Sequence, residues 1–103
     1  MEHPVFLKKF YGERELAELE KRGVPAQSVA AAFAAKEAFS KALGTGISGF
    51  SLREVELLHE DSGKPYLFLS GSAKELAGKL SFDVSVTHTD ALASATVIAW
   101  EEE

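Results

Sequence analysis

Apolar and polar positions along this chain recur with two different periods, and the change of period separates predicted helices from predicted strands. In the strongly charged stretch 13–22, Leu16 and Leu19 are three residues apart, which is the spacing of one helical face. Gly23 and Pro25 follow directly and cannot easily continue a helix. This pattern predicts a short amphipathic helix over residues 13–22, with both leucines facing inward.

A second and longer helix is predicted over residues 28–43. Ser28 is a suitable N-cap, and the alanine-rich stretch that follows has high intrinsic helicity. Gly44 ends the apolar pattern, as is typical of a helix C-cap. The residues of this helix that we expect to be buried are Val29, Ala35, Phe39 and Leu43.

Strand-like alternation begins after this helix. Apolar and charged residues alternate over 52–59, a second strand is predicted over 67–70, and Asp-Ser-Gly at 61–63 has the composition of a turn. The pattern therefore predicts a β-hairpin. Tyr66 and Phe68 should share one face of its second strand, because successive side chains of a strand point to opposite sides.

The last third of the chain predicts one more helix and a second hairpin. Ser72 is expected to cap a helix over 73–80, in which Leu76 and Leu80 are one turn apart. Strands are predicted over 82–88 and 93–100, joined by a turn at 89–91, with residues 101–103 as a frayed tail. The expected fold is an α+β domain with helices packed on an antiparallel sheet, and residues 1–103 are expected to form a single domain.

Composition excludes several classes of function. The chain of 103 residues has no cysteine, so disulfides, zinc thiolates and thiol catalysis are excluded. Residues 1–53 hold eight Lys or Arg against six Asp or Glu, a balance of +2, whereas residues 54–103 hold three against ten, a balance of −7. The total of −5 disfavours a nucleic-acid partner. Without an apolar run of about 20 residues, a cytoplasmic location away from membranes is expected.

Charged residues on the alanine-rich helix are the first candidates for chemistry. Glu37 and Lys41 stand one turn apart, and Gly44 and Gly46 follow at the helix end, where backbone N–H groups can approach an anion. A carboxylate, an ammonium group and flexible backbone together indicate a site for a metal and a diphosphate. The alternative is structural: a solvated helix pair worth about 0.2–0.5 kcal/mol, followed by a glycine C-cap.

Three motifs resemble one family in order and spacing. They are Phe-Ala-Ala-Lys-Glu-Ala-Phe-Ser-Lys-Ala-Leu-Gly-Thr-Gly at 33–46, Gly-Lys-Pro at 63–65, and Val-Ser-Val-Thr-His-Thr at 84–89. They are similar to those of the holo-acyl carrier protein synthases, which are 4′-phosphopantetheinyl transferases. The resemblance implies magnesium-dependent transfer of the phosphopantetheine arm of coenzyme A to a serine of an acyl carrier protein, as in fatty acid biosynthesis.

The resemblance also implies a role for individual residues. Glu37 would bind magnesium and assist deprotonation of the attacking serine, and Lys41 would add a positive charge beside the phosphates. Lys36 is less certain, because it is turned by about 100° from Glu37 on the helix. The residues that the resemblance places around coenzyme A are Lys41, Gly44, Gly46, Gly63, Lys64, Pro65, His88 and Thr89.

The chain departs from the family pattern at two places. Family members open with a Gly-Ile-Asp strand whose aspartate is a second magnesium ligand, and Met-Glu-His-Pro-Val-Phe at 1–6 has no such feature, so the chain resembles a member shortened at its N-terminus. Ala31 and Ala32 occupy positions where the family usually has an arginine. The alternatives to an active enzyme are a non-catalytic module that binds coenzyme A or a carrier protein, and a structural subunit that completes another chain's site. A homotrimer is also implied.

Overall fold

The computed structural model describes residues 5–46, 48–89 and 91–101. It gives these elements in chain order: α1 (Val5–Phe10), α2 (Glu13–Lys21), α3 (Ala26–Leu43), the single 3₁₀ turn η1 (Leu52–Glu54), β1 (Val55–His59), β2 (Pro65–Leu69), α4 (Gly71–Ala77), β3 (Leu80–His88) and β4 (Ala93–Glu101).

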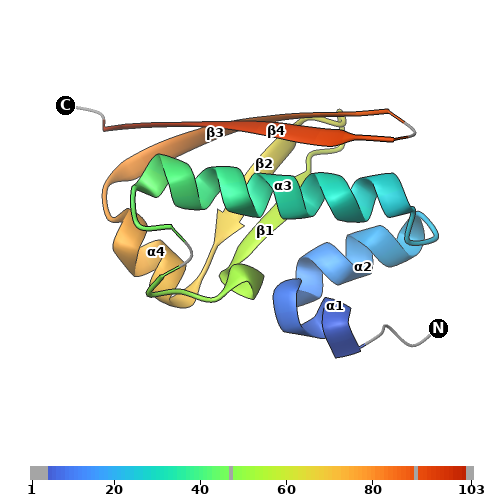
Figure 1. Cartoon of the computed structure of the whole chain (residues 1–103), viewed down its shortest axis with the longest axis horizontal. Coiled ribbons are helices and arrows are strands. Elements are labelled where there is room, and N and C mark those ends of the chain that lie inside the picture. The colour runs from blue at the N-terminus through green and yellow to red at the C-terminus, as the bar shows by residue number, and fades with distance from the viewer. Residues whose placement is uncertain (1–4, 47, 90, 102–103) are drawn as a thin grey trace.

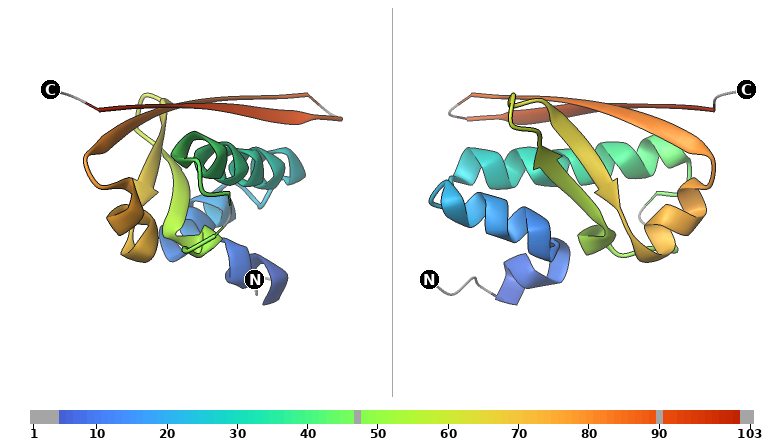
Figure 2. Two further views of the ribbon diagram at one scale, coloured as in Figure 1. Left: turned by 60° about the vertical axis from the view of Figure 1, so that its left-hand side comes forward. Right: turned by 180° about the vertical axis from the view of Figure 1, so that it is seen from behind.

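Helix α3 is the central element, and the others are arranged around it. The long β3–β4 ribbon lies along one side of α3, while α1 and α2 lie on the other (Figure 1). Seen from behind, the β1–β2 hairpin crosses α3 and runs toward α4 (Figure 2). One side of α3 therefore packs against strands, and another part of its surface faces the two N-terminal helices.

The strands confirm the expected α+β class and its antiparallel pairing. In the first hairpin Val55 lies opposite Leu69, and in the second Leu80 lies opposite Glu101. Among the described residues, hydrogen bonds join the strands as two separate hairpins, although β2 and β3 are neighbours in space.

The core has two clusters, one on either side of the middle of α3. Leu16 and Leu19 of α2 are buried in the first, as their spacing predicts. Phe39 is completely buried in the second, where its ring meets those of Phe50 and Phe82 at centroid distances of 5.6 and 4.9 Å. Of the other expected core residues of α3, Ala35 is fully buried, and Val29 and Leu43 are partly buried against these clusters.

Two helix starts differ from the prediction. Helix α3 begins at Ala26 rather than Ser28, because Pro25 is the N-cap and its carbonyl already accepts the Ser28 N–H at 3.0 Å. Helix α4 is capped by Ser70 rather than Ser72 and ends at Ala77. Leu80 therefore belongs to β3, and Leu76 is 44% exposed, so the expected pairing of these two leucines on one helix is wrong.

Three further boundaries were not anticipated. The first part of the predicted strand 52–59 is η1, because the Glu54 carboxylate accepts the Ser51 N–H and tightens this segment into a turn. Helix α1 was not predicted at all. Strand β4 includes Glu101, so the predicted frayed tail is wrong at that position.

Some predictions lie outside the described residues. The turn at 89–91 contains Asp90, which is not described, although the Thr89 N–H donates to the Leu92 carbonyl at 2.7 Å across it. Residues 102 and 103 of the predicted tail are likewise outside the described range. None of the helices within the described residues combines the length and the apolar character needed to cross a bilayer.

Candidate active site

Glu37 and Lys41 both project from α3 into solvent. The side chains are exposed, and among the described residues neither takes part in an ion pair of the kind formed by Arg14–Glu56, Lys36–Glu15 and His59–Glu18. The ion pair between Glu37 and Lys41, which was the structural alternative, is therefore not formed, although the two are one turn apart. Both groups remain available to a ligand.

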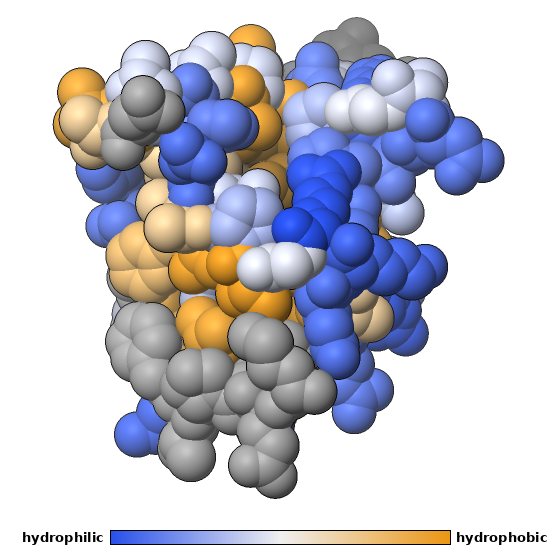
Figure 3. All heavy atoms as spheres, turned by 90° about the vertical axis from the view of Figure 1, so that its right-hand side faces the viewer, coloured by the Kyte–Doolittle hydropathy of each residue, from blue (hydrophilic) through white to orange (hydrophobic). Residues whose placement is uncertain are grey.

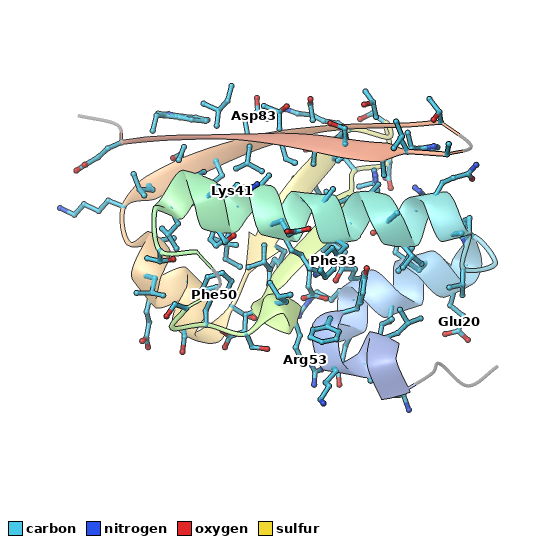
Figure 4. The ribbon with its side chains drawn as sticks, in the orientation of Figure 1. Glu20, Phe33, Lys41, Phe50, Arg53 and Asp83 are labelled. Atoms are coloured by element: carbon cyan, nitrogen blue, oxygen red, sulfur yellow. The ribbon has the colours of Figure 1, made fainter. Side chains whose placement is uncertain are left out.

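Glu37 stands at the edge of an open groove between α3 and α1. The other residues that line this groove are mostly apolar: Leu7, Tyr11, Ala26, Val29, Ala30, Phe33, Ala34 and Ala93. Figure 4 shows Phe33 on the part of α3 beside α1, and Lys41 farther along the helix toward Gly44. Seen toward the α2–α3 connection, apolar surface gathers on one side of the molecule and hydrophilic surface on the other (Figure 3). A carboxylate beside an apolar groove suits an anionic ligand with an apolar arm, provided that a cation bridges them.

Thr89 lies beside the same groove. It lines a hollow with Gln27, Ala91 and Leu92, and this hollow shares Ala26, Ala30 and Ala93 with the groove of Glu37. Two of the residues predicted for the site, Glu37 and Thr89, thus line adjoining hollows.

His88 lies in a different place. It lines a small cavity with Glu18, Arg22, Ser28 and His59, and none of the residues that line this cavity lines the groove of Glu37. His59 pairs across the first hairpin with Pro65, so the predicted Gly-Lys-Pro turn adjoins the cavity of His88. The predicted site residues of one chain therefore form two groups.

Gly44 and Gly46 lie at the opposite end of α3. Gly44 adopts the left-handed conformation, with φ of 87°, and its N–H already donates to the carbonyls of Ser40 and Lys41. The structural explanation of Gly44 as a C-cap is confirmed. An 18-residue helix is about 27 Å long, so these glycines are about that far from the Thr89 end.

Lys36 is directed into the protein, unlike its neighbour Glu37. Its side chain is fully buried, and its Nζ donates to Glu15 Oε1 at 2.6 Å, to the Val55 carbonyl at 2.5 Å and to the Leu52 carbonyl at 3.2 Å. An ammonium group has three N–H donors, and all three are used. Lys36 therefore has no donor left for a phosphate.

The partner of Lys36 is itself held by the backbone. Glu15 accepts the N–H of Leu57 at 2.9 Å and that of Gly12 at 3.3 Å. Burial raises the pKa of Glu15 and lowers that of Lys36, and the attraction between the two charges opposes both effects. A second buried carboxylate, Glu56, accepts the Glu15 N–H at 2.9 Å.

This buried network was not predicted from the sequence. Lys36 is four residues after Ala32 and three before Phe39, so it continues the buried stripe of α3, which was the one available signal. Its partner Glu15 is 21 positions away. Ala31 and Ala32, where the family usually has an arginine, are buried, with exposed fractions of 4% and 2%.

The donors around Glu37 suit magnesium only in part. Within the described chain, no group of three or more His, Asp or Glu side chains is placed to hold a metal ion. Magnesium commonly takes one or two protein carboxylates and completes its octahedron with substrate phosphates and water. One exposed carboxylate beside an open groove fits that pattern once a diphosphate supplies the other oxygens.

Comparison with known proteins identifies the family. The model of the 4′-phosphopantetheinyl transferase superfamily matches residues 2–96. A holo-[acyl-carrier-protein] synthase of Clostridium acetobutylicum is 42% identical over 86 residues, which cover 81% of this chain and 69% of that protein. The crystal structure of the Neisseria meningitidis synthase superposes with a TM-score of 0.85 at 32% identity, covering 94% of this chain and 81% of that one.

A ligand-bound structure is also similar. The Helicobacter pylori holo-[acyl-carrier-protein] synthase in complex with coenzyme A has a TM-score of 0.79 at 28% identity, covering 93% of this chain and 82% of that chain. The motifs, the fold and these similarities agree. The chain belongs to the 4′-phosphopantetheinyl transferase superfamily, as an enzyme of the holo-acyl carrier protein synthase type.

Proposed function

We propose that this chain transfers the phosphopantetheine arm of coenzyme A to a serine of an acyl carrier protein in a magnesium-dependent reaction. The observation that carries the proposal is the exposed Glu37 carboxylate at the edge of an apolar groove on α3, in a fold shared with a synthase whose structure holds coenzyme A. The groove can pack against the carbon chain of the arm, and the carboxylate suits a cation that bridges to a diphosphate.

The reaction exchanges the phosphoanhydride bond of coenzyme A for a phosphodiester bond to serine. The serine hydroxyl oxygen forms a bond to the phosphorus that carries the pantetheine arm. The bond from that phosphorus to the bridging oxygen of the diphosphate breaks, so that adenosine 3′,5′-bisphosphate departs with the electron pair. The serine proton passes to Glu37 or to a water molecule that Glu37 holds. Bound magnesium would supply charge neutralisation at the diphosphate.

Lys41 is the proposed cation at the phosphates. It is exposed one turn beyond Glu37 and has no ion pair among the described residues, so it is free to reach a diphosphate beside Glu37. His88 and Lys64 are the proposed donors to the nucleotide, with the Gly-Lys-Pro turn adjoining the cavity that His88 lines.

A site shared between subunits would explain why these residues form two groups. His88 and Glu37 line separate hollows of one chain, and Gly44 is about 27 Å along α3 from the end that is near Thr89. We propose a homotrimer in which one subunit supplies α3 and its neighbour supplies the end of β3. In a chain that works alone, one ligand would have to reach both groups.

The carrier protein is proposed to approach the N-terminal helices. Lys8 and Lys9 of α1 are exposed, and Arg14 of α2 is 59% exposed with its guanidinium 4.4 Å from the Phe68 ring centroid. A basic face of this kind would attract an acidic protein and accelerate its association.

Mass spectrometry tests the proposal directly. Incubation of the chain with apo-acyl carrier protein, coenzyme A and magnesium should add the mass of the phosphopantetheine arm to the carrier. Glu37→Gln should reduce the rate about 100-fold or more, which corresponds to at least about 2.7 kcal/mol of transition-state stabilisation. Carriers from several systems that all keep their apo mass, with a well-folded preparation, would overturn the assignment.

A second candidate is a non-catalytic module that binds coenzyme A or a carrier protein. It is favoured by the finding that, among the described residues, Glu37 belongs to no group of three or more acidic or histidine side chains that could hold a metal ion. This candidate predicts calorimetric binding of coenzyme A that Glu37→Gln barely changes. A large loss of magnesium-dependent binding in that variant would favour the enzyme instead.

A further inference from the structure

Lys36 connects three segments of the chain at one point beneath α3. Its Nζ joins α3 to Glu15 of α2, to the Leu52 carbonyl of η1 and to the Val55 carbonyl of β1. These contacts lie beside the small buried side chains of Ala32 and Ala35, and they add a polar link to the apolar packing of Phe39 farther along the same helix. We call this set of contacts the Lys36 anchor.

The anchor extends to the wall of the groove beside Glu37. The Lys36 Nζ lies 4.9 Å from the centroid of the Tyr11 ring, a distance within the range of a cation–π contact. Tyr11 is itself buried, donates its hydroxyl to the Val29 carbonyl at 2.7 Å and lines the groove of Glu37. Lys36 thus contacts Tyr11, and its neighbour in the chain, Glu37, lines the same groove as Tyr11.

Neighbouring positions on a helix differ by about 100° in direction, so a fixed Lys36 also fixes the direction of Glu37. A rotation of α3 about its axis that moved Lys36 away from Glu15 would turn Glu37 by the same angle relative to the groove. Catalytic groups lose much of their effect when they are displaced by about 1 Å. Such a rotation would therefore weaken metal binding at the proposed Glu37 site.

We propose that Lys36 is a positioning residue for Glu37, holding the carboxylate at the magnesium–diphosphate position through Glu15 and the η1–β1 corner. This inference rests on the proposed role of Glu37. Lys36 does not contact the substrate, because its three donors are already used inside the protein.

The double variant Lys36→Met/Glu15→Gln tests the proposal. It removes both charges together, so that neither charge is left buried without its partner. Lys74→Met/Glu75→Gln, which removes two exposed charges on α4, is the matched control. Wild type and both variants are compared in the apparent magnesium constant of the transfer reaction, in Mn²⁺ binding in the presence of coenzyme A, measured by electron paramagnetic resonance, and in amide hydrogen exchange.

The anchor predicts a specific change in the first variant. Its apparent magnesium constant should rise at least fivefold, Mn²⁺ should bind correspondingly more weakly, and the amides of α1 and α2 should exchange at least tenfold faster, while those of β3 and β4 are unchanged. The control should match wild type throughout. A folded Lys36→Met/Glu15→Gln variant with wild-type magnesium and Mn²⁺ binding would overturn the positioning role.

A measurement on the wild-type chain covers the case in which the double variant does not fold. Reductive methylation followed by mass spectrometry should leave Lys36 unmodified with or without coenzyme A, and should modify Lys41 unless coenzyme A protects it. Lys36 modified as fast as Lys74 would overturn the anchor. A wild-type chain that neither binds Mn²⁺ nor transfers the arm would end the proposed function, whereas hydrogen exchange in the variants would still decide the anchor.

Discussion

Lys36 and Glu37 are consecutive residues of one motif, yet their surroundings are opposite. Lys36 has no exposed surface and three acceptors, whereas Glu37 is exposed at the edge of an open groove. The difference follows from the 100° step between successive helical positions. A motif on a helix therefore combines residues that hold the fold with residues that meet a ligand, and three-dimensional contacts are needed to assign each one.

The buried side of this comparison predicts the largest effect on stability. Lys36→Met leaves the Glu15 carboxylate buried without its cation, which should cost about 3–5 kcal/mol of the free energy of unfolding. Lys41→Met, an exposed lysine on the same helix, should change it by less than about 0.5 kcal/mol. Urea denaturation of the two variants measures the contrast. Equal losses would mean that the Lys36 anchor contributes nothing beyond an ordinary helical lysine.

Gly12→Ala tests how tightly the buried carboxylates are packed. A Cβ at position 12 would collide with Cδ and Oε1 of Glu56, whose side chain is 2% exposed and accepts the Glu15 N–H. Overpacking of this kind should cost about 1–3 kcal/mol. In a Glu56→Ala background the same substitution should cost much less, because the clash is gone. A double-mutant cycle with no coupling between the two positions would contradict this packing.

Elements with a local sequence pattern were predictable, whereas contacts between distant positions were not. The second hairpin followed from local alternation over 82–88, and the end of α3 followed from Gly44. The Lys36 network joins positions 21 and 19 apart, beyond any local pattern. Helix α1 has six residues and no acidic residue in its first turn, so it carried no signal.

The candidate site was predictable only in part, for a related reason. Resemblance to the family supplied the residue types, and helical spacing placed Glu37 and Lys41 one turn apart on α3. Their relation to His88 depends on how β3 packs against α3, and in the proposed trimer on a second chain as well. Neither relation can be obtained from the spacing of residues along the sequence.

The exposed side of the comparison predicts an effect on ligand binding rather than on folding. Lys41→Met should weaken coenzyme A binding about tenfold, equivalent to about 1.4 kcal/mol, because one charge at the diphosphate is lost. The substitution Lys74→Met on α4 provides the control, and calorimetry measures both. Unchanged affinity in Lys41→Met would remove Lys41 from the proposed site.

Glu54 is intermediate in burial between Lys36 and Glu37, and its substitution should have the smallest effect. Hydrogen bonds from the backbone N–H groups of Ser51, Ser72 and Ala73 lower the pKa of this partly exposed carboxyl below its ordinary value of 4.5, and partial desolvation opposes them. Its stabilisation should therefore be complete above pH 4.5 and be lost as the pH falls toward the lower folded-state value.

The variant Glu54→Gln measures that contribution. At neutral pH it should lower the free energy of unfolding by up to about 1 kcal/mol, because solvent screens an exposed group. The difference from wild type should shrink as the pH falls below 4.5. A difference that stays constant down to the acid transition would show that the charge of Glu54 is not the source.

The most direct test of the division between Lys36 and Glu37 is a crystal structure of this chain with coenzyme A and magnesium. We expect a magnesium ion about 2.1 Å from a carboxylate oxygen of Glu37 and in contact with the diphosphate, while the Lys36 Nζ still donates to Glu15. An ion bound elsewhere with Glu37 left in solvent, or Lys36 turned out to a phosphate, would contradict the account.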